Sequence, residues 1–128
     1  MSKKRILIID DDVSLTQLVK FNLEATGDYE VRIENVSSHA IETALQFHPN
    51  LILLDYIMPG MDGGDVSLKL HDDPVLRRVP IIMVTALVSN REAAEDGTVQ
   101  RSGYLMVAKP IKFEKLKHCI EQQLAEAA

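Results

Sequence analysis

Cysteine and long apolar runs are scarce in this sequence, and each scarcity excludes a class of protein. Cys119 is the only cysteine, so the chain cannot form an intrachain disulfide. Its spacing places it at a core position of the last amphipathic segment, where a thiol behaves as a small hydrophobic side chain. After the basic residues 3–5, the apolar run 6–9 is too short for a signal-peptide core or a membrane span. We therefore expect a cytoplasmic protein without membrane attachment.

Positive charge is also in short supply. The chain has 14 Lys and Arg against 19 Asp and Glu, a net charge of −5. Nucleic-acid binding needs a basic surface, so this balance argues against direct nucleic-acid binding. No helix-turn-helix or zinc-finger spacing is present. The sequence has four histidines: His39, His48, His71 and His118. Neither among themselves nor with Cys119 do they have the spacing of zinc ligands.

The composition is that of one globular domain. The 128 residues are 46% hydrophobic and 26% charged, and no repeat, low-complexity tract or linker divides them. A chain of this length buries roughly two thirds of the surface that its unfolded form exposes. We expect a single domain over residues 1–128.

Short apolar runs alternate with amphipathic segments along the chain. The runs predict strands over residues 6–9, 29–33, 51–54, 81–84 and 104–108. A helix is expected after each of them, over about 14–26, 38–48, 64–71, 90–100 and 112–128. Five successive βα units indicate an α/β fold, a doubly wound parallel sheet with helices on both faces.

The helix boundaries rest on local signals. Ser14 with Gln17 fits a capping box for the first helix, and Ser37 or Ser38 fits the cap of the second. The segment 90–100 is a weaker helix candidate because it is polar and Gly97 interrupts it.

In a doubly wound sheet, ligands bind at the carboxyl ends of the strands. The residues that follow or end four of the predicted strands share one chemistry. Asp10, Asp11 and Asp12 follow the first strand, Asp55 follows the third, Thr85 ends the fourth, and Lys109 follows the fifth.

Carboxylates gathered in one small pocket repel each other unless a cation lies among them or some stay protonated. Ligands that are all oxygen favour a hard ion, and a partial site with room for water suits Mg²⁺. A metal beside a carboxylate, the Thr85 hydroxyl and the Lys109 ammonium fits a phosphoryl-transfer site. Ala86, being small, would leave a backbone N–H open to a phosphoryl oxygen.

Each of these residues also has a structural interpretation. Asp10, Asp11 and Asp12 fit the cap and first turn of a helix, and Asp55 fits a solvated loop. Thr85 and Lys109 fit ordinary strand ends. The functional interpretation depends on their joint placement, because four different strands end in the residue types that one reaction needs.

The chain resembles the receiver domains of two-component response regulators, of the chemotaxis-regulator type, over essentially its whole length. The matching pieces are Ile8-Ile9-Asp10-Asp11, Leu54-Asp55, Met58-Pro59-Gly60-Met61-Asp62-Gly63, Thr85-Ala86 and Lys109-Pro110. The resemblance implies a flavodoxin-like (βα)5 fold with strand order 2-1-3-4-5. It also implies a signalling protein that catalyses its own phosphorylation and slow dephosphorylation, not a metabolic enzyme.

The resemblance implies roles for the acidic residues. Asp55 would be the phosphoacceptor. Asp11 would bind Mg²⁺ directly, Asp10 mainly through water, and the backbone carbonyl of Ile57 would be a further ligand. The phosphoryl donor would be a phosphohistidine on a sensor histidine kinase or on a histidine phosphotransfer protein.

The resemblance also implies a switch. Thr85 and Lys109 would contact the phosphoryl oxygens, Ala86 would move with Thr85, and the peptide bond between Lys109 and Pro110 would be cis. Phosphorylation would then repack the face formed by segment 90–100, strand 104–108 and the last helix. That face would bind a downstream effector, a fused output domain or a second copy of the chain.

Three features depart from the family pattern. An aromatic residue is expected three residues before Lys109, but Met106 stands there and Tyr104 lies two residues earlier. The interval from Thr85 to Lys109 also looks about two residues longer than usual, so either Tyr104 or Met106 is a candidate for the switch residue. Gly64 is expected to loosen the start of the third helix.

Two other functions fit parts of the sequence. A haloacid-dehalogenase-type phosphatase would use Asp10-x-Asp12 as its nucleophile motif, but it needs an acidic pair after the lysine and usually a longer chain. A receiver-like interaction module that is never phosphorylated is the second alternative, and the complete acceptor set argues against it.

Overall fold

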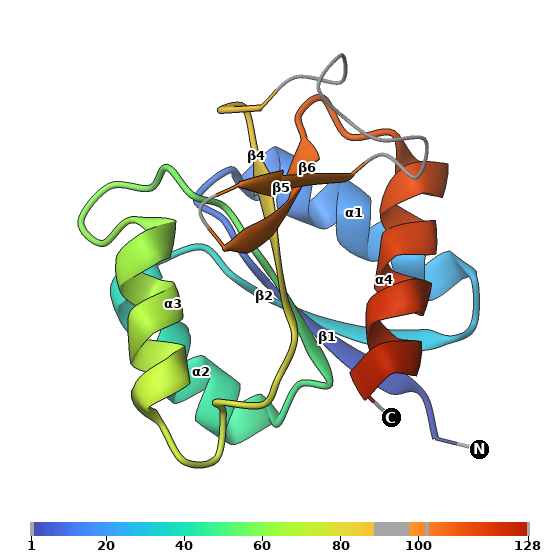
Figure 1. Ribbon diagram of the computed structural model, residues 1–128. Coiled ribbons are helices and arrows are strands. Elements are labelled where there is room, and N and C mark those ends of the chain that lie inside the picture. Colours follow the sequence, from blue (N-terminus) through green and yellow to red (C-terminus); the bar gives the residue numbers. More distant parts are fainter. Residues whose placement is uncertain (1, 89–97, 102, 128) are drawn as a thin grey trace.

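The computed structural model of the chain describes residues 2–88, 98–101 and 103–127. These residues form a six-stranded sheet of order β2-β1-β3-β4-β6-β5, with four α-helices and one 3₁₀ turn packed around it (Figure 1). The strands are β1 (Lys4–Ile9), β2 (Tyr29–Glu34), β3 (Leu51–Leu54), β4 (Ile81–Thr85), β5 (Thr98–Arg101) and β6 (Tyr104–Ala108).

The parallel part of the sheet confirms the predicted fold. The five strands predicted from the sequence pair in parallel with one another, and their spatial order is 2-1-3-4-5 when β6 is counted as the fifth. All four residues of β3 are buried, as expected for a central strand covered on both faces. The chain therefore has the doubly wound α/β fold of the flavodoxin type.

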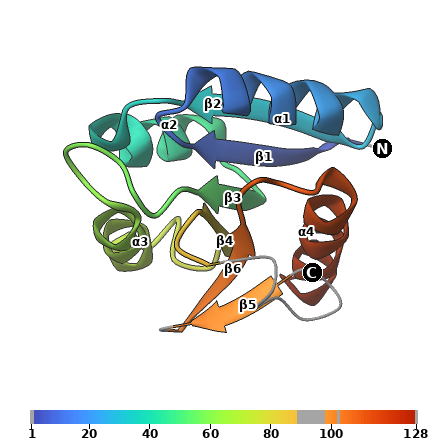
Figure 2. The same ribbon diagram turned by 90° about the horizontal axis from the view of Figure 1, so that it is seen from above.

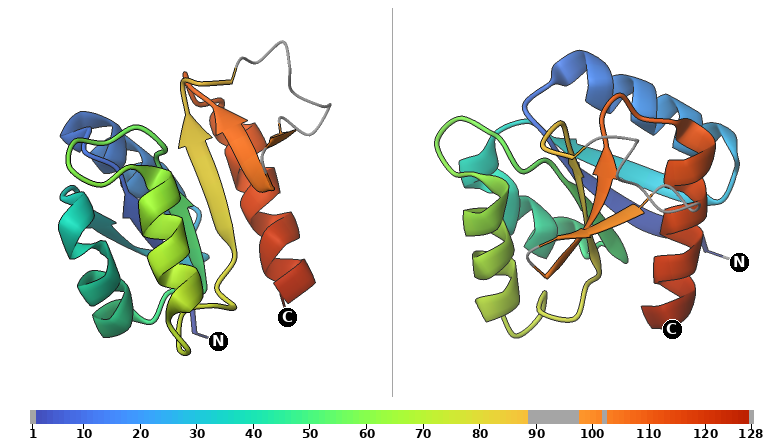
Figure 3. Two further views of the ribbon diagram at one scale, coloured as in Figure 1. Left: turned by 60° about the vertical axis from the view of Figure 1, so that its left-hand side comes forward. Right: turned by 45° about the horizontal axis from the view of Figure 1, so that its top comes forward.

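The helices cover both faces of the sheet. They are α1 (Val13–Ala25), α2 (Ala40–Phe47), α3 (Gly63–Asp72) and α4 (Phe113–Ala127), with the 3₁₀ turn η1 (Ser37–His39) before α2. Seen from above, α2 and α3 lie on one side of the strands, and α1 and α4 lie on the other (Figure 2). Figure 3 shows the same layers from two further directions.

The core divides into two clusters, one on each face, because alternate side chains of a strand point in opposite directions. Leu7 and Ile9 of β1 pack with residues of α2 and α3, whereas Ile6 and Ile8 pack with residues of α1 and α4. Cys119 is 1% exposed in the second cluster, which agrees with its predicted core position.

The region after β4 differs from the prediction. Residues 90–97 of the expected helix lie outside the described residues, and its last three residues belong to strand β5. β5 pairs antiparallel with β6 and extends the sheet at its edge. Gly103, with a φ of 81°, stands directly before β6, and glycine adopts this conformation without steric cost.

Two predicted caps are wrong. Asp12, not Ser14, caps α1, because its side chain accepts a hydrogen bond from the backbone N–H of Leu15 at 3.0 Å. Neither serine caps α2, which begins after the 3₁₀ turn without a side-chain cap.

Of the helices in the described ranges, none combines the length and the apolar character needed to cross a membrane.

Candidate functional site

The carboxyl ends of β1, β3, β4 and β6 meet at one edge of the sheet. Asp10 follows β1 and Asp55 follows β3, and the Asp55 N–H extends the ladder by donating to the carbonyl of Ile9 at 2.9 Å. Thr85 is the last residue of β4, and Lys109 follows β6. Parallel strands thus bring together residues that are up to 99 positions apart.

Asp10, Asp11 and Asp55 form a compact acidic cluster. Each offers one carboxylate oxygen, and these oxygens all lie within 4.8 Å of one another. Asp10 and Asp55 are buried, whereas Asp11 is exposed. Because every ligand is an oxygen and one side is open to water, the donor set fits a hard divalent ion that keeps some of its water, such as Mg²⁺.

Lys109 places a positive charge between two of these carboxylates. Its Nζ donates to Asp10 Oδ2 at 2.9 Å and to Asp55 Oδ2 at 3.4 Å. Burial acts to lower the pKa of Lys109, but the hydrogen bond to Asp10 and the charges of both carboxylates outweigh it and raise that pKa. The side chain therefore stays an ammonium and offsets part of the acidic charge.

The environment of Asp55 favours its neutral form. Burial raises the pKa of the Asp55 carboxyl most, and the nearby charge of Asp10 raises it further. Lys109 and the N–H of Ile57, which lies 3.4 Å from Asp55 Oδ1, act in the opposite direction but do not cancel the shift. A bound cation would favour the carboxylate, which is the nucleophilic form.

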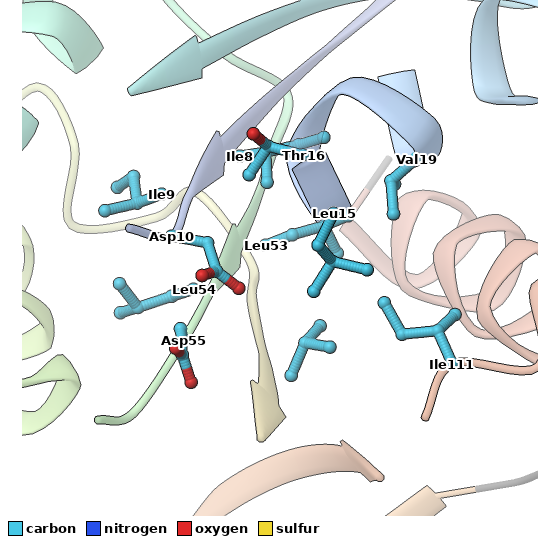
Figure 4. Close-up of a pocket in the computed structure, with 11 residues that line it drawn as sticks. Ile8, Ile9, Asp10, Leu15, Thr16, Val19, Leu53, Leu54, Asp55 and Ile111 are labelled. Atoms are coloured by element: carbon cyan, nitrogen blue, oxygen red, sulfur yellow. The ribbon is translucent and has the colours of Figure 1, made fainter. Parts of the chain in front are cut away.

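A small, mostly apolar pocket lies beside Asp10 and Asp55, which both line it (Figure 4). Besides these two acidic residues, it is lined by apolar side chains from β1, β3, β4 and α1, by Ile111 and by Thr16. This apolar lining agrees with the part that burial plays in raising the pKa of Asp55.

Thr85 is fully buried at the end of β4, and its backbone carbonyl accepts from the N–H of Lys109 at 3.0 Å. Its Oγ1 accepts from the N–H of Leu87 at 3.2 Å, while Ala86 between them is exposed. The parallel register pairs Leu54 with Met83. Asp55 therefore lies level with the residue that precedes Thr85 on the neighbouring strand. The loop after β4 therefore begins beside Asp55.

Of the remaining predicted residues, Ile57 and Pro110 adjoin this site, whereas Met106 lies within β6 and Tyr104 at its amino end. Ile57 is 57% exposed on the loop after Asp55, and the Lys109–Pro110 peptide bond is cis, as the resemblance implies. Met106 is 3% exposed in the core, whereas Tyr104 is half-buried beside a surface cleft. The pairing of β6 with β4 is unbroken from Leu105 to Ala108, so no bulge moves Tyr104 into the place of Met106.

Sequence reasoning missed one residue of the site. Asn35, directly after β2, donates its side-chain amide to the backbone carbonyl of Asp10 at 2.7 Å. The signal was available, because Asn35 follows a strand at the same edge of the sheet as Asp10 and Asp55.

Comparison with known proteins agrees with this geometry. The family model described as the response regulator receiver domain matches residues 6–121. The polar-differentiation response regulator DivK of Brucella ovis is 31% identical over 124 residues, which cover 97% of this chain and 98% of that protein.

Longer curated proteins match over only part of their length. The DNA-binding dual master transcriptional regulator RpaA of Synechocystis is 34% identical over 113 residues, 88% of this chain but 45% of that protein. The response regulator PleD of Caulobacter vibrioides is 42% identical over 83 residues, 65% of this chain and 18% of that protein. The chain thus spans less than half the length of these two relatives.

Solved structures share the fold. A putative response regulator from Chloroflexus aurantiacus has a TM-score of 0.81 at 24% identity, over 97% of this chain and 99% of that chain. A CheY-like response regulator receiver domain protein from Methanospirillum hungatei has a TM-score of 0.79 at 28% identity, over 98% and 97%. With a family match over residues 6–121 and a relative matched along nearly its whole length, this chain belongs to the response regulator receiver domain family.

Proposed function

We propose that residues 1–128 act as a phosphoacceptor domain in which Asp55 receives a phosphoryl group in a Mg²⁺-dependent reaction. The observation that supports this most is the convergence of three carboxylates and one ammonium on a single edge of the sheet. Membership of the receiver family makes the chain a signalling protein, and the phosphoacceptor chemistry is the finer proposal.

The proposed metal ligands are carboxylate oxygens of Asp10, Asp11 and Asp55 and the backbone carbonyl of Ile57. Asp10 is expected to act mainly through water. When bound, Mg²⁺ would offset negative charge on the group being transferred. The three carboxylate oxygens already lie within 4.8 Å of one another, so little rearrangement of the side chains is needed to share one ion.

The transfer depends mainly on the positions of the reacting groups and on stabilisation of their charge. An oxygen of the Asp55 carboxylate attacks phosphorus in line, and the bond from phosphorus to the donor's imidazole nitrogen breaks. The electron pair leaves with the imidazole, and the product is an acyl phosphate on Asp55. Lys109 and the Thr85 hydroxyl are proposed to hold the phosphoryl oxygens, with the N–H of Ala86 as a further donor.

The proposed switch starts from the new charge on Asp55. Thr85 would turn towards the phosphoryl group and draw Ala86 and the following loop with it. Of the face expected to respond, β6 and α4 lie within the described residues. Pro110, and either Tyr104 or Met106, are the proposed residues that pass the change to this face.

The proposed partners follow from the chemistry and the family. The phosphoryl donor would be a sensor histidine kinase or a histidine phosphotransfer protein. The output would be a separate effector or a fused domain, because RpaA and PleD extend well beyond the matched region while DivK does not. A homodimer through β6 and α4 is a further proposed output, and the cytoplasm is the proposed location.

Incubation with acetyl phosphate and Mg²⁺, followed by intact mass measurement, tests the proposal. We expect a phosphate-sized mass gain that requires Mg²⁺ and disappears in Asp55→Asn but persists in the matched surface variant Asp72→Asn. A gain that survives Asp55→Asn contradicts the assignment. An adduct on Asp10 would support the phosphatase alternative, and no gain in any variant would support the unphosphorylated interaction module.

A further inference from the structure

The segment from Asn35 to Ser37, directly after β2, reaches both loops that carry the acidic cluster. One loop is the turn of residues 10–12 between β1 and α1, and the other is residues 55–62 between β3 and α3. No proposed ligand or phosphoryl contact lies in the segment itself. Its two polar side chains nevertheless make hydrogen bonds to the main chain of both loops, and Asn35 also bonds to a side chain of α1.

Asn35 fixes the first loop. Its Nδ2 donates to the carbonyl of Asp10 at 2.7 Å and to the hydroxyl of Thr16 in α1 at 3.1 Å. The N–H of Asp10 donates to the carbonyl of Glu34 at 3.1 Å, so the main chain of Asp10 is held on both sides by the end of β2. Because the Asp10 carbonyl belongs to the peptide unit that leads into Asp11, this bond orients the point from which the exposed Asp11 side chain starts.

Ser37 fixes the second loop. It is 7% exposed, and its Oγ donates to the carbonyl of Pro59 at 3.0 Å and accepts from the N–H of Met61 at 3.2 Å. The hydroxyl thus bridges the two main-chain groups on either side of Gly60. These two hydrogen bonds fix the turn at Gly60, which comes after Asp55 and Ile57 in the same loop.

We propose that Asn35 and Ser37 are positioning residues, which hold the two loops at the separation at which one divalent ion can bridge Asp11 and Asp55. The inference deepens the proposed function and rests on it. Mg²⁺ needs near-ideal octahedral oxygen geometry at roughly 2.0–2.1 Å, so a displaced loop weakens binding without removing a ligand. Groups that orient metal ligands commonly change metal affinity about ten-fold or more when they are removed.

The experiment is a titration of the whole ¹⁵N-labelled chain with MgCl₂, which follows the amide resonances of Asp11 and Ile57. We expect Asn35→Ala and Ser37→Ala each to raise the Mg²⁺ dissociation constant about ten-fold. Excess Mg²⁺ should restore phosphorylation from acetyl phosphate in both variants. Ser37→Thr keeps the hydroxyl and should bind Mg²⁺ as the unaltered chain does.

Two matched controls separate positioning from general stability. Asn50→Ala removes an asparagine whose Oδ1 accepts from the backbone N–H of Arg5 at 2.8 Å, at the opposite end of the same strands. Ser38→Ala changes the exposed neighbour of Ser37. Both should leave the Mg²⁺ dissociation constant unchanged, even where urea denaturation shows that Asn50→Ala lowers the free energy of unfolding.

The outcomes are distinct. If Asn35→Ala and Ser37→Ala bind Mg²⁺ as tightly as the unaltered chain, the positioning role is wrong while the proposed function stands. If the unaltered chain does not bind Mg²⁺, both proposals fail. Should Asn35→Ala not fold, Asn35→Ser serves in its place, because its side chain is too short to reach the Asp10 carbonyl and the same weakening is expected.

Discussion

The ammonium of Lys109 lies 2.9 Å from Asp10 Oδ2, across 99 positions of sequence, and it also reaches Asp55 Oδ2 at 3.4 Å. One cation therefore holds two buried carboxylates that would otherwise repel each other. Its side chain is 20% exposed, so water screens this interaction only in part.

Replacement of Lys109 by methionine keeps most of the apolar stem and removes the charge. We expect the free energy of unfolding without Mg²⁺ to fall by about 3 kcal/mol, because two buried carboxylates are left without their cation. Urea denaturation of Lys109→Met beside Lys112→Met, a change at an exposed lysine, measures the difference. Equal losses in the two variants would show that Lys109 does not carry this role.

Asp55→Asn should raise the free energy of unfolding of the metal-free protein, whereas Lys109→Met lowers it. The pKa of Asp55 is raised by burial and by Asp10, so folding favours the protonated form over the carboxylate. Stability from the protonated form is fully present below the ordinary pKa of 3.8 and is lost as the pH rises through the raised value. An amide does not lose a proton in this range, so Asp55→Asn keeps its stability as the pH rises.

Asp55→Asn should therefore be more stable than the unaltered chain at neutral pH, and the difference should vanish at acidic pH. Urea denaturation in a chelator, at pH values below 3.8 and at neutrality, measures it. A variant less stable than the unaltered chain at neutral pH contradicts the argument. Mg²⁺ should narrow the difference, because it stabilises the unaltered carboxylate and not the amide.

The parallel sheet and most of the site could be predicted because both follow from local patterns and one topological rule. Apolar runs such as Leu51–Leu54 identify buried strands, and parallel strands place their carboxyl ends at one edge. That rule alone brings Asp10 and Asp55 to the same edge as Lys109. The distances between these residues were not needed to predict the cluster.

Other features could not be predicted because they depend on contacts between distant parts of the chain. The residues of β5 have no strong period, and β5 exists as a strand through its pairing with β6. The bonds from Asn35 to Asp10 and from Ser37 to Pro59 join residues 25 and 22 positions apart. Asp12 and Ser14 are both acceptable caps, and only the course of the turn after β1 selects Asp12.

Gly63, the first residue of α3, is required by the acceptor loop. A Cβ at this position would lie 2.5 Å from the carbonyl oxygen of Asp55 and 2.6 Å from the Cα of Tyr56, and both are backbone atoms. We expect Gly63→Ala to cost about 1–3 kcal/mol, as overpacking commonly does, and to slow phosphorylation because the chain at Asp55 must shift.

Gly64→Ala is the matched comparison. A Cβ there would meet a side-chain oxygen of Asp62 at 3.2 Å, and alanine favours the helix by roughly 0.5–1 kcal/mol, so the net change in stability should be small. Urea denaturation and the rate of mass gain with acetyl phosphate measure both variants. Similar behaviour of the two would mean that the loop tolerates a side chain at Gly63.

Tyr29 should make the protein sensitive to alkali. The pKa of its phenol is raised first by burial, since it is 4% exposed, and then by the charges of Glu121 and Asp28. A raised pKa in the folded state contributes stability that is complete below the ordinary value of 10.0 and is lost as the pH rises towards the folded value. The unfolded chain loses the proton first, so alkali favours unfolding.

Tyr29→Phe has no proton to lose at this position, so its free energy of unfolding should fall less between neutral pH and pH values above 10.0. Glu121→Gln should show an intermediate loss, because it removes one of the charges that raise the pKa but leaves the burial. Urea denaturation of the three proteins across this range gives the comparison. If the unaltered chain and Tyr29→Phe lose stability in parallel, the phenol is not the group responsible, because burial in the folded state would then not be holding its proton.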